Sequence, residues 1–203
     1  MQTVKDHIKR DILQSAATLF LEKGYLKVPM REIAHKSGVG LSNIYNYFSC
    51  KDDIFVQIVT PAVRTFENML DEHHGRRGTD IMAMCDRDYF KYMVDEYTSF
   101  IHRHRDLLLL LLFRSQGSSL ENYKEEFARK STALVKEYFT LMKHKHPQLE
   151  TDISDFSIRM HTVWMFALFE ELLMRRVKPD EIEKVVTEYM TIEVAGWREL
   201  MKI

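Results

Sequence analysis

The chain has 203 residues, and its shares of hydrophobic residues (45%) and charged residues (29%) exclude a disordered or fibrous protein and favour a globular one. The net charge of −1 contains a small asymmetry, because residues 1–55 hold eight Lys and Arg against six Asp and Glu, whereas the remainder holds 21 against 24. This asymmetry neither identifies nor excludes a DNA-binding segment, which needs only a local basic surface.

The sequence indicates neither export nor membrane insertion. Its two cysteines, Cys50 and Cys85, fit no metal-binding spacing and no disulfide framework. Charged residues near the N-terminus leave no apolar core for a signal peptide, and the longest apolar runs, at 107–113 and 163–169, are far shorter than a membrane span of roughly 20 residues. Few glycines and prolines are available for the turns of a sheet. We therefore expect a cytoplasmic, all-α protein without a membrane segment.

Three short helices are predicted within the first 50 residues. Apolar residues recur at spacings of three and four over residues 4–23, and Gly24 follows the last turn, as is typical of a helix end. A second helix is predicted after Pro29, then a tight turn at residues 37–40, and a third helix at residues 41–48. Three helices, the last two joined by a glycine-containing turn, are typical of a helix-turn-helix domain.

From residue 51 onward the predicted helices become longer. Glycine, serine and proline residues separate them, and no internal repeat is present. The expected helices are 51–72, 86–104, 106–116, 119–145, 153–176 and 180–201. The sequence thus predicts about nine helices, in a helix-turn-helix DNA-binding domain at residues 1–50 and a larger helical effector-binding and dimerisation domain at residues 51–203.

Residues 24–54 carry the most specific pattern in the chain, GYLKVPMREIAHKSGVGLSNIYNYFSCKDDI. This segment includes Ile-Ala, Gly-Val, Tyr-x-x-Phe and Lys-Asp-Asp in continuous register, and it closely resembles the N-terminal domain of the TetR family of regulators. Residues 12–20 resemble that family's first helix. The resemblance covers about a quarter of the chain and implies a homodimeric DNA-binding regulator, with repression as the usual sign of control.

Helical spacing separates an inward and an outward face in the third predicted helix. Ile44 and Phe48 point inward at i and i+4, so the opposite face presents amide, hydroxyl and apolar groups that suit adenine edges, phosphates and thymine methyls. The resemblance assigns DNA contact most clearly to Tyr45, Tyr47 and Lys51. The full set of candidate DNA-binding residues is Gly40, Leu41, Ser42, Asn43, Tyr45, Asn46, Tyr47 and Lys51.

Two positions at helix starts depart from the family pattern, and Val28 also replaces a common Thr. Pro29 stands where the family commonly has Ser or Thr before the second helix, and Gly40 stands where Ser or Thr usually caps the recognition helix. Glycine is an acceptable cap, but it offers no hydroxyl to a phosphate. We therefore expect both helices to begin without a side-chain cap.

Two apolar stripes follow the helix predicted at residues 153–176. A helix that is apolar on two faces usually lies between two layers, here its own domain and a partner subunit. The resemblance implies a homodimer formed through this helix and the last one. One stripe comprises Ile158, His161, Met165, Leu168 and Leu172, and the other Phe156, Met160, Val163, Ala167 and Met174. The last helix would contribute Ile182, Val185, Val186, Tyr189, Met190, Val194, Trp197 and Leu200.

An excess of aromatic and Met side chains between the predicted helices at 86–116 and 153–176 suits a pocket for a small hydrophobic effector. The same residues could simply fill a core, and His161 could be a hydrogen-bonded core histidine or a polar anchor, because both structures use the same residue types. The candidate pocket residues are Glu96, Phe100, Phe113, His161, Trp164 and Met165.

The favoured function is a transcriptional regulator that reads a palindrome-like DNA duplex and is released by an organic effector. One alternative is a helix-turn-helix regulator without an effector, and another is an all-helical enzyme. No nucleophile elbow, zinc-protease motif, phosphate-binding loop or dinucleotide fingerprint is present, so we expect no catalytic residue and no cofactor. The nine histidines show no metal-binding spacing, and no metal is expected.

Overall fold

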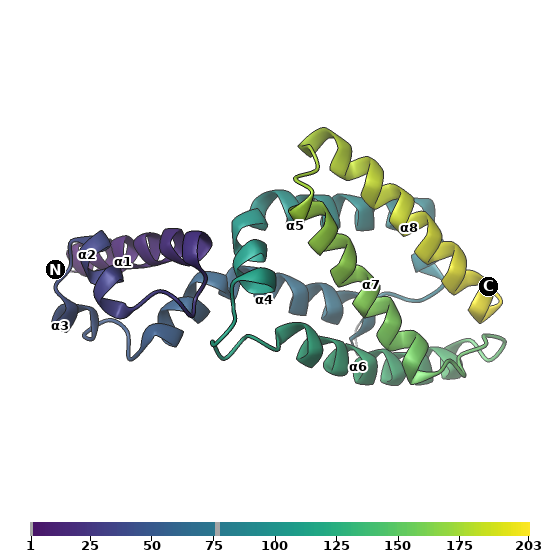
Figure 1. The fold of residues 1–203 in the computed structure, drawn as a ribbon. Coiled ribbons are helices and arrows are strands. Elements are labelled where there is room, and N and C mark those ends of the chain that lie inside the picture. The colour runs from purple at the N-terminus through teal and green to yellow at the C-terminus, as the bar shows by residue number, and fades with distance from the viewer. Residues whose placement is uncertain (1, 76–77) are drawn as a thin grey trace. The chain divides into compact units, whose positions relative to one another are not determined.

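The structure is a computed structural model that describes residues 2–75 and 78–203 (Figure 1). Its described residues form eight α-helices and one short 3₁₀ helix, with no strand, which confirms the all-α fold class. The helices are α1 Gln2–Lys23, α2 Met30–Ser37, α3 Leu41–Ile44, α4 Lys51–His74, the 3₁₀ helix Ala83–Cys85, α5 Arg87–Phe113, α6 Tyr123–Lys145, α7 Asp155–Met174 and α8 Pro179–Met201.

The break expected between residues 104 and 106 is present as a kink within one helix, α5. His104 is the residue at which the backbone leaves helical geometry, with φ −119° and ψ 21°. No glycine or proline lies within α5, so nothing prevents the helical hydrogen bonds from resuming at once. The expected break is a kink rather than a loop.

The third predicted helix is shorter than expected. α3 ends at Ile44 rather than at residue 48. Beyond it the backbone tightens, since Asn46 N donates to Asn43 O (3.1 Å) and Tyr47 N to Ile44 O (2.9 Å), both three residues back. Asparagine, tyrosine and β-branched isoleucine are weak helix formers, so one α-turn followed by tighter turns fits this sequence.

Contacts divide the chain into two compact units. The N-terminal unit comprises Met1–Arg64 and Asp106–Tyr123, and the C-terminal unit comprises Thr65–Arg105 and Lys124–Ile203. Helices α4 and α5 therefore each contribute residues to both units. Whether residues 1–50 act as the DNA-binding part, with residues 51–203 as the effector and dimerisation part, stays a prediction.

Three rings form the centre of the N-terminal unit. Phe20 of α1 lies 5.6 Å from Tyr25 and 5.5 Å from Phe55 of α4, measured between ring centroids, and Tyr25 lies 5.1 Å from Phe55. Gly24, which precedes Tyr25, has φ +78°, a backbone conformation that suits glycine after a helix end. Tyr25 N then donates to Arg114 O (2.9 Å), just beyond α5.

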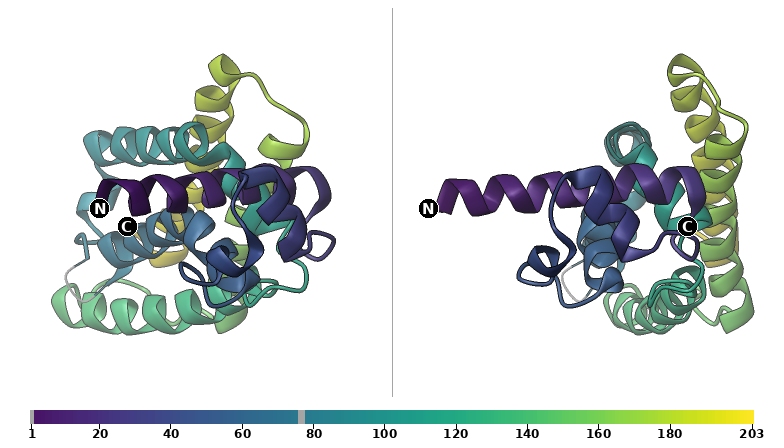
Figure 2. Two further views of the ribbon diagram at one scale, coloured as in Figure 1. Left: turned by 90° about the vertical axis from the view of Figure 1, so that its left-hand side faces the viewer. Right: turned by 60° about the vertical axis from the view of Figure 1, so that its left-hand side comes forward.

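The helices of the C-terminal unit pair antiparallel around Phe66 of α4. Its buried ring contacts aromatic rings from α5, α6 and α7 at centroid distances of 4.7 to 5.6 Å. These rings belong to Phe100, Phe127, Phe166 and Phe169. Helices α7 and α8 form a hairpin, visible in Figures 1 and 2, in which His161 packs on Trp197 and Trp164 on Tyr189.

The two apolar stripes predicted for α7 differ in burial. In the first stripe Ile158, Met165 and Leu172 are buried in the C-terminal unit, whereas the second stripe includes Phe156 and Met174, which are 71% and 65% exposed in the single chain.

Among the described residues, no helix is both long and apolar enough to cross a membrane.

Candidate functional site

The turn between α2 and α3 is held by its backbone. Gly38 has φ +68°, and its N–H points back to the last carbonyls of α2, at Ala34 and His35. Val39 N donates to Ala34 O (3.2 Å) as well. A residue with a Cβ would be strained at this φ, so glycine allows the sharp change of direction between the two helices.

Buried apolar residues fix both helices of this element on the N-terminal unit. Ile33 and Ala34 of α2 are buried, as are Ile44 of α3 and Phe48 in the turn that follows. A single helical turn such as α3 has no stability of its own, so these contacts hold it in place. This is the inward face that the sequence predicts.

The opposite face of α3 and its following turn lies open to solvent. Tyr45 is 51% exposed, although it is a large aromatic residue, and Tyr47 is half-buried. Asn46 Nδ2 donates to Asn43 Oδ1 (3.0 Å), which leaves one amide donor group and one amide acceptor facing outward. The exposed members of the predicted DNA-binding set are Gly40, Leu41, Ser42, Asn43, Tyr45 and Asn46.

Lys51, the last predicted DNA contact, has partners within its own unit. Its Nζ donates to Tyr25 O (2.9 Å) and Val28 O (3.0 Å) and lies 4.1 Å from the centroid of the Tyr25 ring. Burial lowers the pKa of Lys51 from its usual value. An ammonium group has three N–H donors, so one remains for a phosphate, and that contact stays a prediction.

The N-terminus of α4 is stabilised by the two acids that follow Lys51. Asp53 Oδ2 accepts from Ser49 N (3.1 Å), and hydrogen bonds from Gln57 and Ser49 lower the pKa of Asp53 despite its partial burial. Asp52 Oδ1 accepts from Ser119 N (2.9 Å) in the segment after α5. Negative side chains are favoured at this end of a helix by its dipole.

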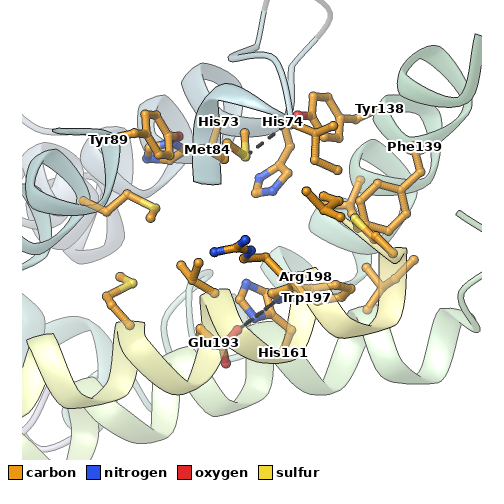
Figure 3. A pocket seen from close by; sticks show the side chains of 18 of the residues that line it. His73, His74, Met84, Tyr89, Tyr138, Phe139, His161, Glu193, Trp197 and Arg198 are labelled. Carbon is orange, nitrogen blue, oxygen red and sulfur yellow. Dashed lines mark hydrogen bonds and ion pairs between the residues drawn. The ribbon is translucent and has the colours of Figure 1, made fainter. Parts of the chain in front are cut away.

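The C-terminal unit contains a partly enclosed cavity of about 130 Å³ (Figure 3). Residues of α4, α5, α6, α7 and α8 line it, together with Ile81, Met84 and Ile203. Most of the lining is aromatic or aliphatic, including Met84, Tyr89, Met93, Tyr138, Phe139 and Trp197. The imidazole-bearing and charged lining residues are His73, His74, His161, Glu193 and Arg198.

Of the six predicted pocket residues, His161 lines this cavity and the other five do not. Met165 lies with His161 on a smaller neighbouring cavity of about 50 Å³. Phe100 is buried against Phe66, and Phe113 belongs to the N-terminal unit. The aromatic content of these helices therefore divides between a core and a cavity lining, the two alternatives that the sequence left open.

Glu96 and Trp164 have other surroundings. Glu96 Oε2 lies 2.7 Å from His73 Nε2, and Glu96 Oε1 accepts from Tyr92 at 3.3 Å, so its carboxylate supports the cavity wall through His73. Trp164 is 42% exposed and packs edge-on against Tyr189. For Glu96 and Trp164, as for the other four predicted pocket residues, a role in effector binding stays a prediction.

His161 is held by a buried carboxylate that the sequence analysis did not single out. Its Nδ1 makes a short contact with Glu193 Oε2, which requires a hydrogen on Nδ1, and Trp197 Nε1 donates to the same oxygen (3.0 Å). Glu193 is thereby satisfied although it is buried. A Glu four residues before a Trp within an apolar stripe was the available signal in the sequence.

His74 and Arg198 are the other lining residues that sequence reasoning missed. His74 is at the C-terminal end of α4, and burial, together with the neighbouring His161 and His73, lowers its pKa to about 3. Arg198 extends from α8 into the cavity (Figure 3). These two residues come from helices far apart in sequence and line one cavity, and no sequence pattern predicts that they do.

A sequence model of the family described as "Bacterial regulatory proteins, tetR family" matches residues 12–58, the segment that contains α2, α3 and the solvent-exposed face of α3. The chain is also similar to an HTH-type transcriptional regulator of Haemophilus influenzae, with 23% identity over 145 residues that cover 70% of this chain and 66% of that protein. Residues 12–58 of the chain thus match the TetR family's N-terminal domain.

The match of the chain to curated relatives is partial, because it spans between a third and two thirds of their length. Solved structures share its fold over most of the chain. NalD of Pseudomonas aeruginosa, the secondary repressor of the MexAB-OprM multidrug efflux pump, has TM-score 0.61 and 20% identity, covering 93% of this chain and 96% of that one. FadR of Bacillus subtilis, solved in complex with stearoyl-CoA, has TM-score 0.59 and 17% identity, covering 89% and 96%.

Both departures from the usual TetR-family pattern have the expected structural consequence. Neither Pro29 before α2 nor Gly40 before α3 makes a side-chain capping hydrogen bond. Backbone carbonyls close both first turns instead, with Glu32 N donating to Pro29 O (3.0 Å) and Asn43 N to Gly40 O (2.9 Å). The absence of hydroxyl caps, inferred from the sequence, is thus confirmed.

Proposed function

We propose that this chain is a sequence-specific DNA-binding transcriptional regulator of the TetR family. The observation that carries the proposal is the open face of α3, where amide, hydroxyl and aromatic groups stand free while Ile44 and Phe48 anchor the element. Such a face offers donors and acceptors to base edges in a major groove. Its proposed reading residues are Leu41, Ser42, Asn43, Tyr45, Asn46 and Tyr47, with Lys51 and the backbone at Gly40 next to phosphates.

The active form in this proposal is a homodimer assembled through α7 and α8. Exposed apolar side chains on both helices support it, and they lie at the i, i+4 spacing of an unpartnered helix face. They are Phe156, Met160, Val163, Trp164 and Met174 on α7, with Ile192 and Leu200 on α8. Four of the α8 residues proposed from sequence, Ile182, Val186, Tyr189 and Met190, are buried within their own subunit, so Leu200 and Ile192 would provide more of the interface.

A small organic effector would bind the cavity of the C-terminal unit and release the DNA, which makes the chain a cytoplasmic repressor. Support comes from the predominantly apolar lining and from the two helices that belong to both units, α4 and α5. His73 and His74 at the end of α4, and Tyr89 near the start of α5, line the cavity. A regulator that binds DNA without any effector is the alternative.

The decisive experiment is the selection of bound duplexes from a random DNA pool by the purified full-length chain. We expect a palindrome-like motif, since two identical reading heads related by a two-fold axis favour one. Tyr47→Ala and Asn43→Ala should weaken binding to the selected duplex by tenfold or more, given roughly 1–3 kcal/mol for each good base contact. Gln14→Ala, which replaces an exposed neutral residue on α1, is the matched control.

Two results would contradict the proposal. One is a failure to enrich any motif with folded protein, and the other is unchanged affinity in both α3 variants while their circular dichroism is normal. If a motif is enriched but no compound that binds the cavity alters DNA affinity, the regulator without an effector is the correct function.

A further inference from the structure

The polar groups that line the cavity of the C-terminal unit differ in whether they have partners. His73 is satisfied by Glu96 and by the Tyr89 hydroxyl, and Glu193 receives hydrogen bonds from Trp197 and His161. Paired in this way, these groups need nothing from a ligand. They form a fixed polar frame around an apolar interior.

Arg198 and His74 have no such partners. Within the part of the chain that the structure describes, the Arg198 guanidinium makes no ion pair or side-chain hydrogen bond, and the His74 ring makes no hydrogen bond. Both side chains point into the cavity, His74 from α4 and Arg198 from α8 (Figure 3). Glu193, the one acidic side chain among the described residues of the lining, already binds other groups. The cavity therefore offers a guanidinium and an imidazole that have no hydrogen-bond partner among the described residues.

The size of the cavity limits the apolar part of a ligand. An engineered protein cavity of about 150 Å³ holds one benzene molecule, and the volume here is about 130 Å³. The walls are aromatic and Met side chains, which pack well on a flat ring. A long acyl chain would require the walls to move apart, whereas one ring fits the space that already exists.

We propose that this cavity binds a small organic monocarboxylate about the size of benzoate or phenylacetate, whose ring lies among the apolar walls and whose carboxylate pairs with Arg198. The planar guanidinium matches a carboxylate with two parallel hydrogen bonds. His74 supplies a further N–H to the same group. This inference rests on the proposed effector function and defines the chemical class of the effector.

Binding is measured without DNA on the full-length chain, by calorimetry and by the fluorescence of Trp197, which lines the cavity. The probes are benzoate and phenylacetate, their neutral amides, and stearate. We expect the acids to bind the wild type about ten- to a hundredfold more tightly than the amides, the range for a hydrogen-bonded charged group. Stearate should bind more weakly than phenylacetate.

Three variants test the anchor. Arg198→Met should abolish the preference for acid over amide, and Arg198→Lys should restore part of it. Lys184→Met removes an exposed cation from the same helix at a position outside the cavity lining, and it should bind as the wild type does. Arg198 is exposed, so its replacement should leave the fold intact, which circular dichroism checks.

Equal affinity of acids and amides in the wild type, or an acid preference that survives Arg198→Met, would overturn the inference. So would tight binding of stearate alone. The inference and the proposed function fail separately. Acid binding at Arg198 without any effect on DNA affinity would support the ligand class and refute its role as effector. Release of DNA by a neutral compound that binds the cavity would support the effector function and refute the ligand class.

Discussion

Replacing Lys51 by Met should destabilise the N-terminal unit, whatever it does to DNA binding. The Lys51 ammonium donates to two main-chain carbonyls, Tyr25 O at 2.9 Å and Val28 O at 3.0 Å, and faces the Tyr25 ring at 4.1 Å. Hydrogen bonds from a charged group contribute about 1.5–3 kcal/mol, and a cation–π contact at a partly exposed site adds about 0.5–1 kcal/mol. The cost of burying part of the ammonium, which lowers its pKa, offsets some of this gain. We expect a loss of about 2–3 kcal/mol.

Two probes distinguish the units in urea unfolding. Both tryptophans, Trp164 and Trp197, lie in the C-terminal unit, so their fluorescence reports that unit, whereas circular dichroism at 222 nm reports the helices of both. Lys51→Met should shift the dichroism transition to lower urea more than the fluorescence transition. Lys27→Met is the matched control, because Lys27 is exposed and lies in the turn between Tyr25 and Val28, whose carbonyls bind Lys51. It should unfold as the wild type does.

The competing view is that Lys51 contacts a DNA phosphate and contributes nothing to the stability of the folded chain. A phosphate contact contributes about one unit to the slope of log affinity against log salt for each half of a dimer, and its loss weakens binding to all sequences alike. If Lys51→Met unfolds within a few tenths of a kcal/mol of the wild type but lowers the salt slope, the intramolecular contacts are unimportant and our reasoning is wrong. Lowered stability with an unchanged slope would refute the phosphate contact instead.

Three further changes test other parts of the structure. The pKa of His74 is about 3 in the folded chain, below its unfolded value of about 6.5. Between these two pH values the unfolded state binds a proton on His74 that the folded state does not bind. The free energy of unfolding should therefore fall as the pH decreases from 6.5 towards 3. In His74→Phe the loss between pH 7 and pH 5, followed by urea unfolding, should be smaller by about 1–2 kcal/mol; an identical pH profile would refute the buried neutral imidazole. Phe66→Ala removes a ring that contacts four others, and it should cost about 3–5 kcal/mol in fluorescence-monitored unfolding, whereas a cost below about 1 kcal/mol would be incompatible with that packing. Met160→Arg puts a charge on the exposed face of α7. If the proposed dimer forms through this face, the variant should be monomeric in light scattering where the wild type is dimeric, and a variant that remains dimeric would refute the proposed interface.

The N-terminal element could be predicted from sequence because its signals are local. Gly24 and Gly38 mark positive φ angles after two helix ends, and Ile44 and Phe48 define the inward face by their spacing alone. The length of α3 was overestimated, since helical spacing persists through tighter turns and only the hydrogen bonds reveal the difference. The break expected between residues 104 and 106 lies at His104, as a kink within α5.

The cavity could be predicted in kind but not in place. Aromatic and Met residues indicate apolar packing, but they do not show what they pack against. Tyr89, Met93 and Phe100 all lie on α5, yet Phe100 packs against Phe66 whereas Tyr89 and Met93 line the cavity. Which side of α5 is filled depends on neighbours far away in sequence, on α4, α6, α7 and α8. His161 was identified because it interrupts an apolar stripe. Arg198, near the end of α8, belongs to no predicted stripe and was therefore missed.

The magnitude of any effector response follows from the same contacts. A ligand shifts a conformational equilibrium by no more than its difference in affinity for the two states. If Arg198 pairs with a carboxylate in one state only, that difference is about ten- to a hundredfold per subunit. Helices α4 and α5 each contribute residues to both units, and His74 and Tyr89 on them line the cavity. Two bound ligands per dimer would then lower DNA affinity by at most about 10² to 10⁴-fold, enough to release an operator only where the unliganded protein exceeds its Kd by less than that factor.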